Sequence, residues 1–183
     1  MVAASARGAD PLIAVDLDDE KLAFARRFGA THTINAGKAD PIAEIRALTQ
    51  KSDRSTIRRE TVAGADFVFD CIGIKKTMEQ IVPAARTGFF GGESGGTAVL
   101  VGVPTTGVEL DPLDLLMNEK RFIGSIGGSC SPDRDFPRYI KWHQEGTLDL
   151  ESLVTERFRI EDINAATAAL ESGEIQGRAI LVF

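Results

Sequence analysis

The residues Pro11-Leu-Ile-Ala-Val-Asp16 form a short apolar run that ends on a carboxylate, and this stretch decides the fold. A continuous apolar run of this length is typical of a parallel β-strand that is buried on both faces. Asp18 or Asp19 can cap the helix that follows, and Gly29 can end it. The stretch therefore predicts a strand, a tight turn and a helix, which together form the repeating unit of a parallel α/β sheet.

The alternation of strands and helices continues as far as residue 126. Further strands are predicted at 31–34, 65–73, 97–103 and 121–126, and helices at 41–50, 76–86 and 112–118. Residues 51–62 are polar and basic and are interpreted as an exposed excursion between two of these elements.

The pattern changes after Gly128. Helices are predicted at 136–144 and 160–170, an extended segment at 152–158 and a terminal strand at 178–183. These elements add no strand–helix–strand unit to the first sheet, so a domain boundary is predicted between residues 127 and 128.

The composition and the distribution of charge limit the kinds of molecule that this protein is expected to bind. The 183 residues carry a formal net charge of −6, and the lysines and arginines are scattered rather than gathered into a stripe. This distribution argues against nucleic acid and against an anionic membrane surface as partners. No apolar run is long enough to span a bilayer, and residues 1–9 lack the apolar core of a signal peptide, so a cytoplasmic location is expected. Cys71 and Cys130 share no motif spacing, which argues against a disulfide framework.

Asp16 is the strongest candidate for a binding residue. In dinucleotide-binding folds, an acidic residue at the tip of a strand accepts hydrogen bonds from the adenosine ribose hydroxyls. A carboxylate there also repels a 2′-phosphate and therefore selects NAD over NADP. Taken alone, Asp16 is better explained as a helix N-cap or an exposed strand end, but the surrounding sequence reverses that preference.

Five segments, in a fixed order, carry a family resemblance. They are Ile13 to Asn35 (IAVDLDDEKLAFARRFGATHTIN), Asp66-Phe-Val-Phe-Asp-Cys-Ile-Gly73, Val99-Leu-Val-Gly-Val-Pro104, Gly124-Ser-Ile-Gly-Gly128 and the closing segment Leu170 to Phe183. Together they resemble the zinc-type medium-chain alcohol dehydrogenases. The resemblance covers essentially the whole chain but only about the C-terminal half of the family's length.

The resemblance implies that NAD is the cofactor and assigns residues to each part of it. Asp16 and Lys21 would bind the adenosine ribose, Leu17 and Ile72 would enclose the adenine, and Arg178 would reach the pyrophosphate. The remaining residues would line the cofactor near the nicotinamide: Gly73, Val101, Gly102, Val103, Ser125 and Gly127. A solvated helix face is the alternative for Lys21, and core packing is the alternative for Ile72 and Val101.

The same resemblance implies an incomplete Rossmann-type doubly wound parallel sheet. Its strand order is 3-2-1-4-5-6, and the first strand and the Gly-rich loop of that order have no counterpart in this chain. Residues 1–127 would then be a partial dinucleotide-binding domain, and residues 128–183 the C-terminal segment of the GroES-like catalytic domain. The family's zinc ligands belong to the N-terminal half, so no catalytic residue and no metal ligand is assigned here.

The function implied is that of a truncated NAD-dependent alcohol dehydrogenase, which transfers hydride between NAD and a small alcohol or aldehyde. Two alternatives stay open: a non-catalytic fragment for dinucleotide binding or oligomerisation, and the zinc-free quinone-reductase branch. NADPH is usual in that branch, and Asp16 argues against it.

Two further features lead to expectations about assembly and catalysis. Residues 122–126 are predicted to form the outermost strand of the sheet, and the resemblance implies a homodimer through that edge. Gly92-Glu-Ser-Gly-Gly96 matches the G-x-S-x-G pattern of hydrolases, but it follows a helix and opens a strand, which is the reverse of a nucleophile elbow. It is interpreted as a mobile turn.

Overall fold

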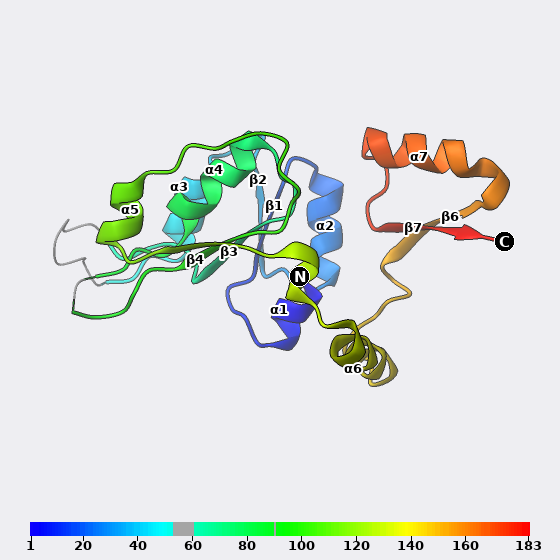
Figure 1. The fold of residues 1–183 in the computed structure, drawn as a ribbon, viewed down its shortest axis with the longest axis horizontal. Helices are drawn as coiled ribbons and strands as arrows, with labels where there is room; N and C mark the ends of the chain where they lie inside the picture. The colour runs from blue at the N-terminus through cyan, green and yellow to red at the C-terminus, as the bar shows by residue number, and fades with distance from the viewer. Residues whose placement is uncertain (53–60, 90) are drawn as a thin grey trace. The chain divides into compact units, whose positions relative to one another are not determined.

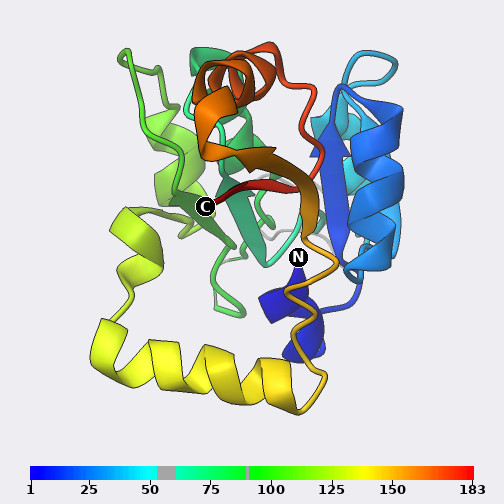
Figure 2. The same ribbon diagram turned by 90° about the vertical axis from the view of Figure 1, so that its right-hand side faces the viewer.

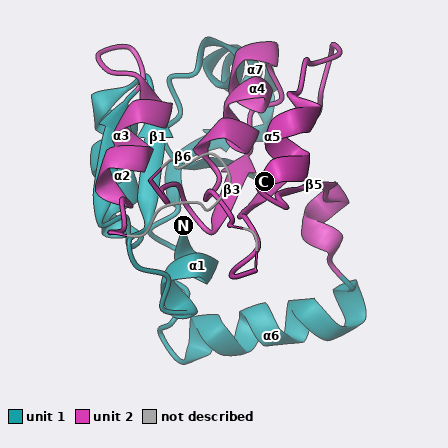
Figure 3. Ribbon diagram, turned by 90° about the vertical axis from the view of Figure 1, so that its left-hand side faces the viewer, with its two compact units in different colours: residues 1–35, 131–183 teal, residues 36–130 magenta. Residues whose placement is uncertain are grey.

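A computed structural model describes residues 1–52, 61–89 and 91–183 of the chain (Figure 1). Contacts divide these residues into two compact units, one formed by residues 1–35 with 131–183 and the other by residues 36–130 (Figure 3). The division falls after Cys130, close to the predicted boundary, but it groups the first two strands with the C-terminal segment. The assignment of residues 128–183 to a separate domain therefore stays a prediction.

The N-terminal part of the first unit contains a parallel pair of strands. Its elements are α1 (Val2–Ala6), β1 (Ile13–Asp16), α2 (Asp19–Arg27) and β2 (His32–Asn35). β1 and β2 pair in parallel, with Asp16 opposite Asn35. Leu22 of α2 is buried together with Ala14 and Ala30, so α2 covers one face of the pair.

The other face of β1 is only partly covered. Val15 alternates with Ala14 along the strand and is 39% exposed, so the prediction of burial on both faces is wrong for this residue. α2 itself begins and ends as the sequence predicts. Asp18 accepts a hydrogen bond from the amide of Glu20 (2.7 Å), and Gly29 follows the helix at a φ of +100°, which glycine adopts without strain.

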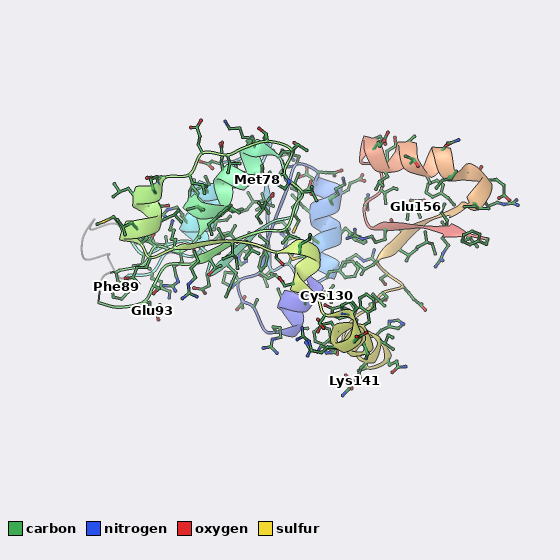
Figure 4. All side chains as sticks on the ribbon, viewed as in Figure 1. Met78, Phe89, Glu93, Cys130, Lys141 and Glu156 are labelled. Carbon is green, nitrogen blue, oxygen red and sulfur yellow. The ribbon has the colours of Figure 1, made fainter. Side chains whose placement is uncertain are left out.

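The second unit contains a three-stranded parallel sheet. Its elements are α3 (Pro41–Leu48), β3 (Phe67–Asp70), α4 (Lys75–Ala84), β4 (Thr97–Leu100), α5 (Pro112–Met117), β5 (Arg121–Gly124) and the short 3-10 helix η1 (Ile126–Ser129). The strand order is β3-β4-β5, as predicted for this half of the sheet. Ile81 and Val82 of α4 pack with Ala98 of β4, and Met78 of the same helix, labelled in Figure 4, is only 1% exposed.

The opposite face of this sheet is largely bare within the described part of the second unit. Phe67 and Phe69 alternate with Val68 along β3 and are 64% and 56% exposed. In the register, Val99 of β4 lies between Phe69 and Ile123 of β5. Ile123 is exposed as well, whereas the central Val99 is buried. Parallel sheets are normally covered on both faces, and here α4 and α5 cover one of them.

The C-terminal part of the first unit forms a strand–helix–strand motif of its own. Its elements are α6 (Pro132–Gln144), β6 (Val154–Arg159), the 3-10 turn η2 (Ile160–Asp162), α7 (Ile163–Ser172) and β7 (Arg178–Val182). β6 and β7 pair in parallel with each other, and α7 contacts both (Figure 2). Within the described residues they pair with no strand of the other sheets. No helix of this part or of the other described segments is both long and apolar enough to cross a membrane.

α6 begins at Pro132, earlier than the predicted start at residue 136. A proline is favourable in the first turn of a helix, where its missing amide has no partner to lose. Asp135 accepts a hydrogen bond from the amide of Ser131 (2.8 Å), and Arg134 donates to both of its carboxylate oxygens. The hydrogen bonds from Arg134 and then from Ser131 hold the pKa of Asp135 well below its usual range.

Two loops differ from their predictions. Val62, at the end of the supposed exposed excursion, is only 2% exposed, and its carbonyl oxygen accepts a hydrogen bond from the amide of Lys51 (2.9 Å). Residues 53–60 of that excursion lie outside the described residues. In the glycine-rich loop before β4, Gly95 donates to the carbonyl of Asn118 and Gly96 to that of Arg86, both at 2.8 Å. Backbone hydrogen bonds therefore hold this end of the loop in place, in contrast to the predicted mobile turn. Residue 90 of the loop lies outside the described residues.

Candidate cofactor-binding site

The turn between β1 and α2 holds the carboxylate of Asp16 in one orientation. Asp16 Oδ1 accepts hydrogen bonds from the amides of Leu17 (2.7 Å) and Asp18 (3.1 Å). Its Oδ2 accepts none from the described residues. The cap of α2 is Asp18, so the helix-cap explanation of Asp16 is wrong. Asp16 thus presents an acceptor oxygen at the C-terminal end of a parallel strand, where open α/β sheets bind ligands.

Leu17 and Lys21 flank this carboxylate. Leu17 is 68% exposed, so its side chain offers apolar surface to a ligand. Lys21 is half-buried on α2, and a methyl group placed on Gly173 would lie 3.6 Å from its Nζ. In the same loop, Gln176 Nε2 donates to Glu20 Oε2 (2.7 Å). The loop between α7 and β7 therefore lies against the first turns of α2 and restricts the space around Lys21.

Arg178 follows that loop directly, as the first residue of β7. Its side chain is exposed, and its Nη1 donates to the carbonyl of Gly177 (3.0 Å). The guanidinium thus belongs to the same unit as Asp16 and Lys21, on a segment that contacts α2. Its predicted contact with a pyrophosphate stays a prediction.

The buried Asp70, at the C-terminal end of β3, holds the backbone of four predicted cofactor residues in place by hydrogen bonds. Its Oδ2 accepts a hydrogen bond from the amide of Gly73 (2.9 Å), and its Oδ1 accepts one from the amide of Ile72 (3.3 Å). Its carbonyl oxygen accepts the amides of Val101 and Gly102, both at 2.9 Å. Sequence reasoning did not single out Asp70, although an acidic residue at a strand end, three positions before a glycine, is a signal for it.

Two glycines allow the turns after β3 and β4 to interlock. Gly73 has a φ of +86°, and a Cβ placed on it would lie 2.3 Å from the carbonyl oxygen of Val103. A Cβ on Gly102 would lie 2.3 Å from the amide nitrogen of Gly73. Ile72 follows β3 with 57% of its surface exposed, so it does not belong to the core of the described unit. Val103 is exposed at the same end of the sheet, and Val101 is half-buried.

Ser125 and Gly127 lie beyond the end of β5. The strand covers Arg121–Gly124, so the predicted strand at 122–126 ends two residues too late. Ser125 donates its amide to the carbonyl of Leu100 (2.9 Å), and its hydroxyl oxygen lies 3.0 Å from that of Ser129. Gly127 is exposed at a φ of 55°. After Ser125 the chain enters η1, in which Gly127 and Gly128 both have positive φ values.

The eleven predicted cofactor residues fall into two sets. Asp16, Leu17, Lys21 and Arg178 belong to the first unit, and the seven others, from Ile72 to Gly127, belong to the second. Within each unit the structure brings its set to strand ends or to the helix that follows one.

A family model described as "Zinc-binding dehydrogenase" matches residues 1–145 of the chain. The chain belongs to the zinc-binding dehydrogenase family. It is 29% identical over 179 residues to an alcohol dehydrogenase class-3 of Cereibacter sphaeroides, which covers 96% of this chain and 44% of the relative. A solved alcohol dehydrogenase zinc-binding domain protein of Burkholderia ambifaria is 30% identical with a TM-score of 0.81, and it covers 98% of this chain. The benzyl alcohol dehydrogenase of Acinetobacter calcoaceticus is 28% identical with a TM-score of 0.82, again over 98% of this chain.

This zinc-binding dehydrogenase chain spans less than half of its relatives. It covers 44% of the Cereibacter protein and 44% of each of the two solved chains. In residues 1–52, 61–89 and 91–183, no three histidine, cysteine, aspartate or glutamate side chains are grouped as metal ligands would be. The described residues of this family member therefore do not fit a zinc ion, and no zinc-dependent step is derived from them.

The Cys71 thiol and the Ser94 hydroxyl could in principle act as nucleophiles, but their local surroundings do not favour that role. Cys71 is exposed directly after β3. Partial desolvation, followed by the charge of Asp70, raises the pKa of its thiol, which disfavours the reactive thiolate. Ser94 of the G-x-S-x-G segment donates its hydroxyl to Glu119 Oε2 (2.9 Å) rather than to a histidine base. The hydrolase interpretation therefore has no support in this zinc-binding dehydrogenase.

Proposed function

We propose that this chain is the coenzyme-binding part of an NAD-dependent, zinc-type alcohol dehydrogenase, and that it binds the adenosine half of NAD. The observation that supports this most directly is the fixed carboxylate of Asp16, whose Oδ2 is available to ribose hydroxyls. The side chain of Leu17, the residue after Asp16, is 68% exposed and supplies apolar surface of the kind that an adenine ring requires. In the full-length enzyme the reaction would be hydride transfer between NAD and a small alcohol or aldehyde.

The local charge favours NAD over NADP. Asp16 is followed by Asp18, Asp19 and Glu20, and Lys21 is the single cation among these residues. A 2′-phosphate placed at Asp16 would meet several negative charges at short range. The chain's own residues therefore bind and orient the adenosine, and the catalytic groups are expected in the part of the relatives that this chain does not span.

Replacing Asp16 with alanine is expected to weaken NAD binding about tenfold or more, because a hydrogen bond to a charged group is lost. The preference for NAD over NADP should shrink at the same time, because the main repulsive charge is removed. Isothermal titration calorimetry with both dinucleotides measures the two effects.

Asp133→Ala is the matched control for this experiment, because it removes an exposed carboxylate from α6. It should leave both affinities unchanged. An Asp16→Ala variant with the wild-type preference would show that Asp16 is only a strand end.

We also propose that the chain forms a homodimer through the free edge of β5. β5 pairs with β4 on one side only in the described sheet. Arg121 and Ser125 donate their amides inward, to the carbonyls of Gly96 (3.1 Å) and Leu100 (2.9 Å). Because alternate residues of a parallel strand face opposite neighbours, the amides of Phe122 and Gly124 face outward. An edge of this kind pairs readily with a second strand.

Gly124→Pro is expected to convert the dimer into a monomer, because it removes one of the two outward amides. A Cβ placed on Gly124 would have no neighbouring atom within 4 Å, so steric damage to its own unit should be small. Sedimentation velocity would compare it with Gly107→Pro, a glycine in an exposed loop. A monomeric wild type, or a dimer that persists in Gly124→Pro, would contradict the proposal.

A further inference from the structure

Asn35 connects the end of β2 to the turn that carries Asp16. Its Nδ2 donates to the carbonyl oxygen of Leu17 (3.0 Å) and to Asp19 Oδ1 (2.7 Å). Both partners are oxygen acceptors, so the orientation of the amide is determined: a flipped amide would place its own oxygen against two others. One side chain therefore holds the turn at two points, on either side of Asp18.

Other hydrogen bonds of this turn are local. Asp16 Oδ1 accepts amides one and two residues further along the chain, and Asp18 accepts the amide of Glu20. Such bonds fix the shape of the turn itself. The bonds from Asn35 span 18 and 16 residues and come from the neighbouring strand, directly opposite Asp16 in the register. They fix the position of the turn relative to the sheet.

We infer that Asn35 is a positioning residue for an adenosine 5′-phosphate group with a free 2′-hydroxyl. It holds the turn of residues 16–19 so that Asp16 Oδ2 meets the ribose and the nearby carboxylates oppose a 2′-phosphate. This inference rests on the proposed function. Repulsion between two charges falls with their separation, so a turn that can move away from the ribose discriminates less well.

The test uses two probes that need no nicotinamide site: 5′-AMP and adenosine 2′,5′-bisphosphate. Nuclear magnetic resonance titrations of the full chain would give both dissociation constants for wild type and for Asn35→Ala. Thr33→Ala is the matched control, because Thr33 lies two residues earlier in β2 and accepts a hydrogen bond from Arg26 Nη2 (2.7 Å) at the far end of α2. Each of the two variants thus loses a side-chain link that β2 makes to α2 or to the turn before it.

We expect Asn35→Ala to weaken 5′-AMP binding about tenfold, which corresponds to the loss of a hydrogen bond to a charged group. The dissociation constant of adenosine 2′,5′-bisphosphate divided by that of 5′-AMP should fall about threefold or more towards unity. A purely structural role of Asn35 would not change this ratio. Thr33→Ala should leave this ratio unchanged. If Asn35→Ala does not fold, Asn35→Ser, which keeps one donor, should show the same change in ratio to a smaller extent.

Two results would overturn the inference, and they can be told apart. A wild type that binds 5′-AMP and an Asn35 variant with the wild-type ratio would show that Asn35 only stabilises the fold. A wild type that binds neither probe would overturn the proposed function, and the positioning role with it.

Discussion

Replacing Gly73 with alanine is expected to lower the free energy of unfolding of the second unit by about 3 kcal/mol or more. The φ of Gly73 is +86°, a conformation that costs a residue with a Cβ about 1–2 kcal/mol. The new Cβ would also lie 2.3 Å from the carbonyl oxygen of Val103, and that oxygen belongs to backbone that cannot rotate away as a side chain can. Overpacking of this kind typically adds about 1–3 kcal/mol. Urea denaturation followed by circular dichroism measures the sum.

Two glycines of the same unit separate these contributions. Gly91 has a φ of +80°, but a Cβ placed on it would have no atom within 4 Å, so Gly91→Ala reports the cost of the backbone conformation alone. Gly107 has neither a close neighbour nor a positive φ, so Gly107→Ala should be close to neutral. A Gly73→Ala variant no less stable than Gly91→Ala would mean that the turns after β3 and β4 do not interlock as described.

Lys120→Met is expected to destabilise the second unit by about 3–5 kcal/mol, because it leaves a partner of a buried ion pair uncompensated. Lys120 Nζ donates to Asp114 Oδ2 and to the carbonyl oxygen of Val82, both at 2.9 Å, and its side chain is 2% exposed. Methionine retains most of the apolar stem and its packing. The loss measured by urea denaturation therefore reports the charge and its hydrogen bonds rather than a cavity.

Lys75→Met is the matched control for the buried lysine. Lys75 pairs with Glu79 (3.6 Å) and Glu109 (3.8 Å) at an exposed surface, where ion pairs contribute about 0–1 kcal/mol. Its effect should also decrease with added salt, whereas that of Lys120→Met should not. Equal losses for the two variants would contradict the assignment of Lys120 as a buried link between α4, α5 and β5.

The order of strands and helices could be predicted because the signals are local. Asp18 caps α2 and Gly29 follows it, and the apolar spacing of Met78, Ile81 and Val82 marks the buried face of α4. Burial of the strands on their second face could not be predicted in this way. It depends on what covers Phe67 and Phe69, and no residue of the second unit does so in the described structure.

Sequence patterns single out candidate ligand residues of the site more readily than the residues that support them. Asp16 stands out because it ends an apolar run, whereas Asn35 and Asp70 act through hydrogen bonds that depend on the register of strands and the path of turns. The start of α6 was missed for a similar reason. Pro132 indicates a first turn only together with the bond between Ser131 and Asp135, which the spacing of apolar residues does not reveal.

This chain is proposed to bind the adenosine half of NAD at the end of β1. Titration of the ¹⁵N-labelled wild-type chain with NAD, and in parallel with NADP, tests it most directly, because amide shifts report even weak binding residue by residue. Saturable shifts are expected at the amides of residues 16–21, with a clearly weaker response to NADP. Shifts confined to other residues, equal responses to the two dinucleotides, or no saturable response to NAD would contradict it.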